Sequence, residues 1–376
     1  MTRRFFELLS LMTYKIGFYR PWLNKRALVS YVSTLPIYCR SYFIDSHNSK
    51  LTCYLICKFL NSKGYSVDLR RCDDLNINID KKYSLFIGHT STFPEIKKRI
   101  NLCGKSILLT TGSEPAFGND SQKRQADLLL KRKGVYLPVF EENIVKPALP
   151  SHSEAEKVLM MGNEFVKNTW YKKYSHKYNL INNVSAIPTS FPDALSRKSN
   201  FLFISSIGQV HRGLDLLLDI FSRREYRQNK LYVCSLFNQE TDFTSLYKNE
   251  LFFTENINPI GYVNIRSNRF KELISDCDYV ILPSCSEGQS SSVINTIRMG
   301  LIPVITENVG LPDFSGIGIT IEDTTIEKLK EAINKAINLN DDEFFSMRDG
   351  LKKYVHLFDE GAFVSKLSKV LDHKND

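Results

Sequence analysis

The sequence of 376 residues contains no run of about 20 apolar residues, the length that a helix needs to cross a bilayer. We therefore expect no transmembrane helix. Its eight cysteines form no CxxC pair, and no cleavable signal peptide precedes them. These absences argue against a zinc site and against a disulfide framework. They predict reduced thiols, a cytoplasmic location and no bound metal.

Acidic residues are fewer than basic ones, since 41 Asp and Glu against 50 Lys and Arg give a net charge of +9. This balance can reflect phosphate-rich ligands, an anionic membrane or nucleic acid, or simply a basic soluble protein. No nucleic-acid-binding motif accompanies the charge, so nucleic acid is not an expected partner. Residues 1–26 combine six basic residues with an apolar stripe at helical spacing. This segment could lie on an anionic membrane surface, or it could be a first helix packed on the protein.

Short β-type runs alternate with longer helical patterns, which predicts an α/β fold with parallel sheets. The chain length predicts two domains, and a polar segment with two prolines between 187 and 200 predicts the hinge. We expect an N-terminal domain over 1–190, a C-terminal domain over 191–356, and a last helix at about 357–376 that could return to the first domain. The predicted strands are 27–32, 65–69, 84–88, 106–110, 157–161 and 184–187 in the first half, and 201–206, 231–236, 258–263, 278–283 and 302–306 in the second.

The most informative segment follows the apolar run 278–283, which has the pattern of a buried parallel strand. Glu287 comes next in a turn of small residues, at the carboxyl end of a strand, where open α/β sheets bind ligands. Glu287 could accept hydrogen bonds from sugar hydroxyls, although a lone loop carboxylate would more often be merely solvated. Asn295, about two helical turns further on, could reach a nucleotide ribose. Between them, free amide groups at a helix start could cradle a diphosphate. The residues of that start are Gly288, Gln289, Ser290, Ser291 and Ser292.

A second strand-to-helix turn lies within 201–221, where Gly208 is followed by His211 and Arg212 at the start of an amphipathic helix. Arg212 is placed to neutralise a diphosphate leaving group, whose charge grows as its bond to a sugar breaks. The alternative is an ordinary surface arginine. No complete GxGxxG motif is present, so a dinucleotide site is not expected.

Together the two segments resemble the family 4 retaining glycosyltransferases of GT-B fold, in particular bacterial enzymes that build surface polysaccharides. The resemblance is strong over about 201–312 and weaker over 27–190. It implies two Rossmann-like domains that face each other across a cleft. It also implies retaining, metal-independent transfer of a sugar from a nucleoside-diphosphate sugar to a lipid-linked or polysaccharide acceptor, as in O-antigen, capsule or exopolysaccharide synthesis. No cofactor is expected besides that donor.

Residue by residue, the resemblance assigns the donor site and two catalytic roles, for Glu287 and Arg212. His89 and Glu114, each after an expected strand, are further candidates for a polar group near the reacting carbon. His47 is assigned to acceptor contact or to a helix start. The expected donor-binding residues are Gly208, His211, Arg212, Glu287, Gly288, Gln289, Ser290, Ser291, Ser292 and Asn295.

Two departures from the family pattern leave alternatives open. The family has two glutamates separated by seven residues, whereas this chain has Glu287 and Asn295. An arginine usual after the first strand of the C-terminal domain is missing, and Arg266 or Arg269 could replace it. One alternative is a catalytically silent homologue that binds sugars or acts as a scaffold. A nucleotide-sugar epimerase is the other, although the dense His/Glu/Asp cluster that elimination chemistry requires is not found.

Overall fold

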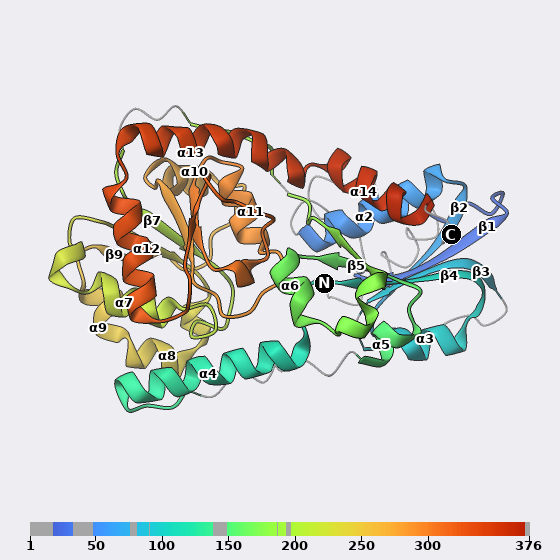
Figure 1. Ribbon diagram of the computed structural model, residues 1–376, viewed down its shortest axis with the longest axis horizontal. Helices are drawn as coiled ribbons and strands as arrows, with labels where there is room; N and C mark the ends of the chain where they lie inside the picture. Colours follow the sequence, from blue (N-terminus) through green and yellow to red (C-terminus); the bar gives the residue numbers. More distant parts are fainter. Residues whose placement is uncertain are drawn as a thin grey trace, which may run out of the picture.

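The computed structural model describes residues 18–32, 48–75, 81–89, 91–137, 149–185, 187–192 and 197–372. The helical stripe expected within residues 1–17 and the assignment of His47 lie outside this range. Two parallel six-stranded sheets, each covered by helices, form two domains that lie side by side (Figure 1). The fold is therefore α/β, as the sequence predicts. Among the described residues, no helix is both long and apolar enough to cross a membrane.

The first sheet has the strand order β2-β1-β3-β4-β5-β6, with every pair parallel. Its central strands are buried apolar runs because helices cover both faces. The strands are β1 (Lys25–Tyr31), β2 (Tyr65–Arg71), β3 (Lys82–His89), β4 (Asn101–Thr110), β5 (Lys157–Met161) and β6 (Tyr178–Ile181). The helices around them are α2 (Asn48–Ser62), α3 (Phe93–Arg99), α5 (Leu149–Glu154), α6 (Glu164–Thr169) and the 3₁₀ turn η4 (Lys172–Lys177).

The second sheet has the order β12-β11-β10-β7-β8-β9 and is also parallel. Its strands are β7 (Phe201–Ile204), β8 (Leu231–Cys234), β9 (Ile257–Pro259), β10 (Tyr279–Leu282), β11 (Ile302–Ile305) and β12 (Ile319–Thr320). Its α-helices are α7 (Leu214–Phe221), α8 (Thr241–Leu246), α9 (Lys248–Phe253), α10 (Asn268–Ser275), α11 (Ser291–Ile297), α12 (Ile326–Asn338) and α13 (Asp341–Tyr354). Short 3₁₀ turns are η5 (Arg224–Tyr226), η6 (Phe237–Gln239), η7 (Glu307–Val309) and η8 (Val355–Phe358).

One predicted strand, 184–187, is wrong. The last strand of the first sheet is β6, and the chain after it runs between the two domains. Asn183 and Ser185 in this linker bind side chains of the second domain instead of a neighbouring strand. Val184 and Ile187 are buried all the same, Val184 in the core of the first domain and Ile187 in that of the second, so their apolar character does not reflect a place in a sheet.

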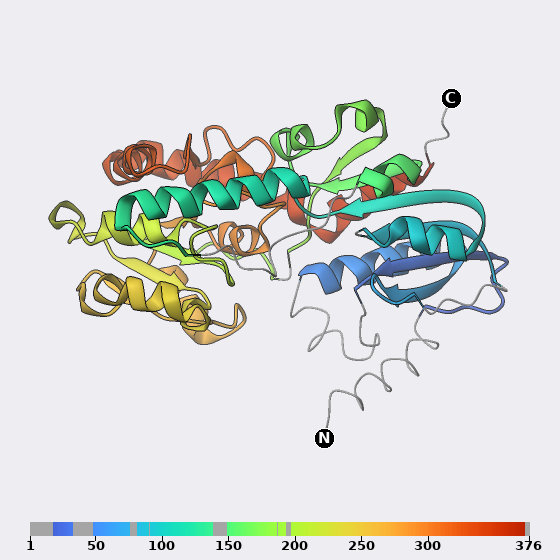
Figure 2. The same ribbon diagram turned by 90° about the horizontal axis from the view of Figure 1, so that it is seen from below.

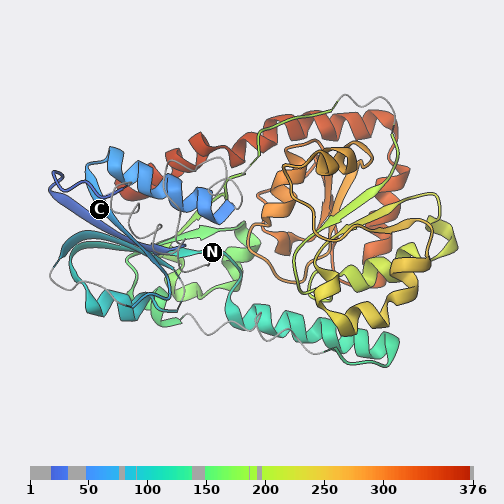
Figure 3. The same cartoon turned by 180° about the vertical axis from the view of Figure 1, so that it is seen from behind.

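Two helices tie the domains together in addition to the linker. Helix α4 (Pro115–Lys133) follows the first sheet in sequence but lies along the second domain, with Leu129 in that domain's core (Figures 1 and 2). Arg132 near its end pairs with Asp215 and Asp219 of α7. Helix α14 (Glu360–Asp372) follows the second domain but packs against α2 of the first (Figure 3).

Candidate functional site

The loops that follow β4 and β10 touch each other where the two domains meet. The main-chain N–H and the hydroxyl of Ser113 both donate to the carbonyl oxygen of Glu287, at 3.0 and 2.7 Å. A Cβ atom at Gly288 would lie 1.9 Å from the carbonyl oxygen of Thr111. Only a glycine at position 288 permits this approach of the two backbones. The loops that leave the carboxyl ends of two strands, one from each sheet, are therefore in direct contact.

A cavity of 390 Å³ opens beside this contact, a volume typical of small-molecule sites. Its walls come mainly from the carboxyl ends of β7, β8, β9 and β10 and from the start of α11, and we call it the donor cavity. Its described lining residues are Asn48, Ile204, Ser205, Ser206, Arg212, Cys234, Leu236, Tyr262, Val263, Asn264, Ile265, Leu282, Glu287, Gln289, Ser290, Ser291, Ser292 and Asn295.

Arg212 and Glu287 face each other in the donor cavity. The Nε atom of Arg212 lies 3.1 Å from Oε1 of Glu287, and its Nη1 donates to the hydroxyl of Ser206 at 2.8 Å. Both charged side chains are less than one-fifth exposed, at 19% and 17%. The ion pair forms because the turns after β7 and β10, which are neighbours in the sheet, bring the two residues together. The two catalytic residues inferred from the family resemblance are thus adjacent in the fold.

Three of the predicted donor-binding residues also hold the linker. The side-chain oxygen of Gln289 accepts from the main-chain N–H of Asn183 at 2.6 Å, and the hydroxyl of Ser291 accepts from Nδ2 of Asn183 at 3.0 Å. Asn295 accepts from the hydroxyl of Ser185 at 2.9 Å through Oδ1. All three still line the donor cavity, so each forms part of its wall while anchoring the chain that joins the domains.

His211 and Gly208 support the turn and do not line the donor cavity. The ring nitrogen Nε2 of His211 contacts the carbonyl oxygen of Ser286, and its main-chain carbonyl accepts from the N–H of Cys285 at 3.0 Å. Burial lowers the pKa of His211, so the ring is neutral near pH 7. Gly208 has a φ of 86°, a left-handed conformation that favours glycine, and its N–H donates to Glu240 at 2.5 Å.

The other two catalytic candidates lie away from the donor cavity. His89 is enclosed, with Nδ1 2.7 Å from the carbonyl oxygen of Leu109 and its ring edge-on to Tyr31. Burial lowers the pKa of His89. Glu114 caps α4 by accepting from the N–H of Phe117 at 2.9 Å, and it also accepts from the hydroxyl of Tyr171 at 2.9 Å. Both side chains have structural contacts in the first domain, and neither is among the described lining residues.

Besides Ser205, Cys234 and Leu236 at the ends of β7 and β8, sequence reasoning missed two further contributions to the donor cavity. Residues 262–265 form one wall after β9, and Tyr262 there is 74% exposed. Asn48 approaches from the first domain at the start of α2. Neither region carries a motif that would have pointed to it. Arg269 does not replace the missing family arginine, since it pairs with Glu272 on α10 at 3.2 Å and does not line the cavity.

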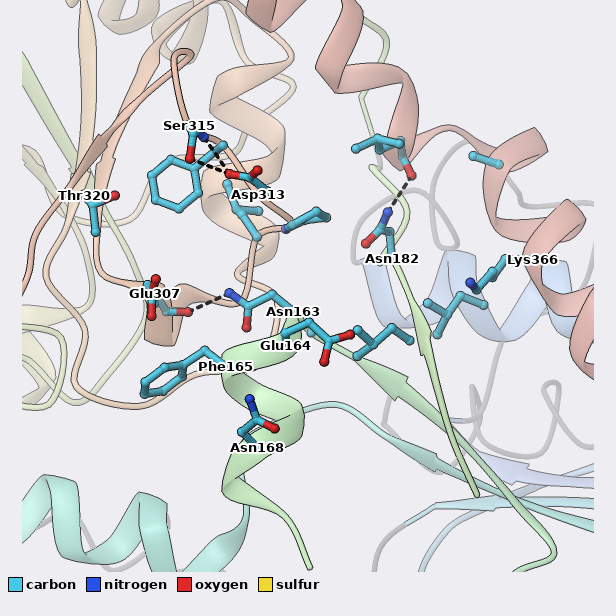
Figure 4. A pocket seen from close by; sticks show the side chains of 18 of the residues that line it. Asn163, Glu164, Phe165, Asn168, Asn182, Glu307, Asp313, Ser315, Thr320 and Lys366 are labelled. Carbon is cyan, nitrogen blue, oxygen red and sulfur yellow. Dashed lines mark hydrogen bonds between the residues drawn. The ribbon is translucent and has the colours of Figure 1, made fainter. Parts of the chain in front are cut away.

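A larger groove of 780 Å³ lies on the other side of the linker, between α6, the 307–315 segment and α14 (Figure 4). Asn163 closes one end by donating to the carbonyl oxygen of Glu307 at 3.1 Å. Asn182 lines this groove and accepts from Nε2 of Gln289 at 2.8 Å, while Gln289 lines the donor cavity. None of the residues predicted for donor binding lines this second groove, whereas seven of them line the smaller cavity.

Comparison with known proteins finds a family similar to the second domain. Residues 198–338, which include β7 to β12, match the family described as glycosyl transferases group 1. The match covers 141 of the 376 residues, so the second domain is similar to this family. No curated protein matches the sequence of the chain.

Solved structures share the arrangement of both domains. Anabaena HepE, solved with UDP and glucose, is 11% identical, with a TM-score of 0.60 over 93% of this chain and 100% of that chain. Sucrose-phosphate synthase from Thermosynechococcus elongatus is 12% identical, with a TM-score of 0.61 over 92% of this chain and 98% of that one. Staphylococcus aureus TarM, solved with UDP, is 13% identical, with a TM-score of 0.53 over 77% of this chain and 55% of that one. These likenesses establish the GT-B fold.

Proposed function

We propose that the protein is a retaining, metal-independent glycosyltransferase that moves a sugar from a nucleoside-diphosphate donor to a glycan or lipid-linked glycan acceptor. The observation that carries the proposal is the ion pair of Arg212 and Glu287 inside the donor cavity. A cation and a carboxylate side by side can serve the two halves of such a donor. The cation suits the diphosphate, and the carboxylate suits the hydroxyl groups of the sugar.

Arg212 would act on the leaving group. When the bond between the sugar and the diphosphate breaks, negative charge grows on the diphosphate, and a fixed guanidinium lowers the energy of that transition state. Its side chain is only 19% exposed, so water screens the interaction less than at an open surface. Glu287 would accept hydrogen bonds from sugar hydroxyls and hold the ring in place. An acceptor hydroxyl would then attack from the face that the diphosphate leaves.

The nucleoside would lie against the remaining walls of the donor cavity. Asn295 has Oδ1 bonded to Ser185, and its amide group would be available to the ribose. The exposed ring of Tyr262 offers an apolar surface for a base. We propose UDP as the nucleotide to test first, because the HepE and TarM structures were solved with it.

The acceptor and the location are part of the same proposal. We place the enzyme in the cytoplasm of a bacterium, at the inner face of the membrane, where it would extend an O-antigen, capsule or exopolysaccharide. The support is the family resemblance together with the six basic residues in 1–26. Binding to liposomes should rise with the fraction of anionic lipid and fall when residues 1–26 are removed. Equal sedimentation of the two proteins would refute the membrane proposal.

A donor screen tests the enzymatic proposal. UDP-, GDP-, ADP- and dTDP-sugars are each incubated with the protein, with and without candidate acceptors, and released nucleoside diphosphate is measured. Arg212→Ala and Glu287→Ala should each lower release by about 100-fold or more, the usual cost of removing a transition-state contact. Arg269→Ala removes an exposed arginine of the same domain and should have little effect. Wild-type rates in the first two variants would refute the roles of Arg212 and Glu287.

A catalytically silent homologue is the second candidate, and one observation favours it. Among the described residues that line the donor cavity, Arg212 is the only cation, and Glu287 already neutralises it. A scaffold protein need bind no nucleotide sugar. Calorimetry with the same panel of donors would separate the candidates, since an absence of binding to all of them supports the scaffold.

A further inference from the structure

Asn48 is the described residue through which the first domain reaches the donor cavity. It is the first residue of α2, and its side chain is buried, with 2% of the residue exposed. Its Nδ2 atom has no hydrogen-bond partner among the described residues. Buried amide groups in folded proteins are almost always paired, because a buried donor without an acceptor is unfavourable. A ligand in the cavity would supply the acceptor.

A chain of hydrogen bonds fixes where Asn48 faces. Thr52 lies one helical turn further along α2, on the same face as Asn48. Its hydroxyl is 3.4 Å from Oδ1 of Asn183, and Nδ2 of Asn183 donates to the hydroxyl of Ser291 at 3.0 Å. This face of α2 is therefore directed at the serine-rich start of α11. Asn48, one turn closer to the cavity, faces the same wall across the space that a ligand would fill.

A diphosphate bound in the donor cavity would need hydrogen-bond donors in addition to Arg212. Arg212 is the cavity's only cation among the described lining residues, and Glu287 lies 3.1 Å from it. A nucleoside diphosphate brings at least two negative charges into this space. The amide group of Asn48 offers two N–H donors without a competing positive charge. The 15-residue helix α2 begins at the same point, so the positive end of its dipole also faces the cavity.

We propose that Asn48 binds the diphosphate of the nucleotide from across the cleft, with Nδ2 donating to a phosphate oxygen. This inference rests on the proposed function. The first domain then supplies part of the anion recognition that the missing arginine would have given, and a bound nucleoside diphosphate bridges the two domains.

The test compares the binding of UDP and UMP to the full-length chain by calorimetry. Asn48→Asp replaces the donor group with a carboxylate of similar size that repels phosphate. We expect it to weaken UDP binding by about 100-fold, and Asn48→Ser to weaken it by about tenfold, the range for a hydrogen bond to a charged group. UMP, which lacks the second phosphate, should bind less tightly than UDP and lose less in both variants. Asn168→Asp makes the same change on the exposed side of α6 and should leave UDP binding within twofold.

Circular dichroism and thermal unfolding establish whether each variant is folded. If Asn48→Asp is unfolded, the binding of UDP to Asn48→Ser is compared with wild type instead. A folded Asn48 variant that binds UDP within twofold of wild type would overturn the inference while leaving the proposed function intact. If wild type binds UDP too weakly to measure, the comparison uses whichever of GDP, ADP or dTDP it binds. Failure of wild type to bind any of the four would overturn both.

Discussion

The contact between the two domains can be tested at Gly288. In the structure its Cα approaches the loop after β4 so closely that a Cβ atom would lie 1.9 Å from the carbonyl oxygen of Thr111 and 2.9 Å from Cα of Gly112. Both contacts are to backbone, which cannot rotate aside as a side chain can. We therefore expect Gly288→Ala to push the two loops more than about 1 Å apart, since real contacts of this kind are rarely shorter than about 3 Å.

The size of the effect follows from the hydrogen bonds that this movement breaks. Ser113 makes two of them to the carbonyl oxygen of Glu287, at 3.0 and 2.7 Å, and neither survives such a shift at full strength. Each contributes about 1 kcal/mol, so the closed arrangement loses about 2 kcal/mol relative to an open one. If transfer requires the closed arrangement, kcat/KM should fall by about 30-fold. Each domain keeps its own core, so the chain should remain folded.

The assay measures kcat/KM for donor turnover and the radius of gyration in solution by X-ray scattering. Gly112→Ala is the matched control, because it lies in the same contact and a Cβ there meets no atom within 4 Å. It should retain both the wild-type rate and the wild-type scattering curve. A Gly288→Ala variant with unchanged rate and unchanged scattering would show that the closed contact is not needed for turnover.

Three further predictions concern charged groups. Glu287→Gln releases Arg212 from its ion pair, so UDP should bind about fivefold more tightly in calorimetry while sugar transfer falls by about 100-fold. Arg132→Ala leaves the wholly buried Asp215 without its partner and should lower the free energy of unfolding by about 3–5 kcal/mol in urea titrations, whereas the double variant R132M/D215L should recover most of it. Burial, with a smaller contribution from Lys177, lowers the pKa of His152 to about 4. Its protonation therefore favours the unfolded chain as the pH falls from about 6.5 to 4, and the free energy of unfolding of wild type should fall by up to about 3 kcal/mol. Urea titrations at pH 7 and 4.5 should show this loss in wild type and not in His152→Phe.

The strands could be predicted because each is a short local pattern. The strand at 157–161 was predicted with the bounds that the structure has. The error at 184–187 has a different origin. Val184 and Ile187 there pack in the cores of the first and second domain without joining a sheet, and sequence periodicity alone cannot separate that environment from the interior of a sheet. The two-residue strand β12 was missed because so short a run has no pattern of its own.

The candidate donor-binding residues could be predicted only where each lies in a local strand-to-helix turn. The turns that carry Arg212 and Glu287 each follow a strand, and the neighbouring positions of β7 and β10 bring them together. By contrast, the contact of Asn295 with Ser185 and that of Gln289 with Asn183 join residues more than 100 positions apart. A local sequence motif contains no information about contacts between residues so far apart in the chain. His89 and Glu114 were placed correctly at strand ends, but the sequence could not show that local contacts occupy their side chains.

The charge balance in the donor cavity links recognition of the donor to the position of the two domains. Among the described residues that line the cavity, Arg212 is the only cation, and Glu287 neutralises it. The second domain alone therefore attracts a diphosphate weakly. The N–H donors of Asn48 are available only while the start of α2 faces the start of α11, which is the arrangement that the Gly288 contact and the linker maintain. If Asn48 carries part of the affinity, then any change that opens the cleft weakens nucleotide binding as well as turnover. Gly288→Ala should accordingly reduce the affinity for UDP, and Asn48→Ser should add little to that loss in the double variant, because both act through the same contact across the cleft.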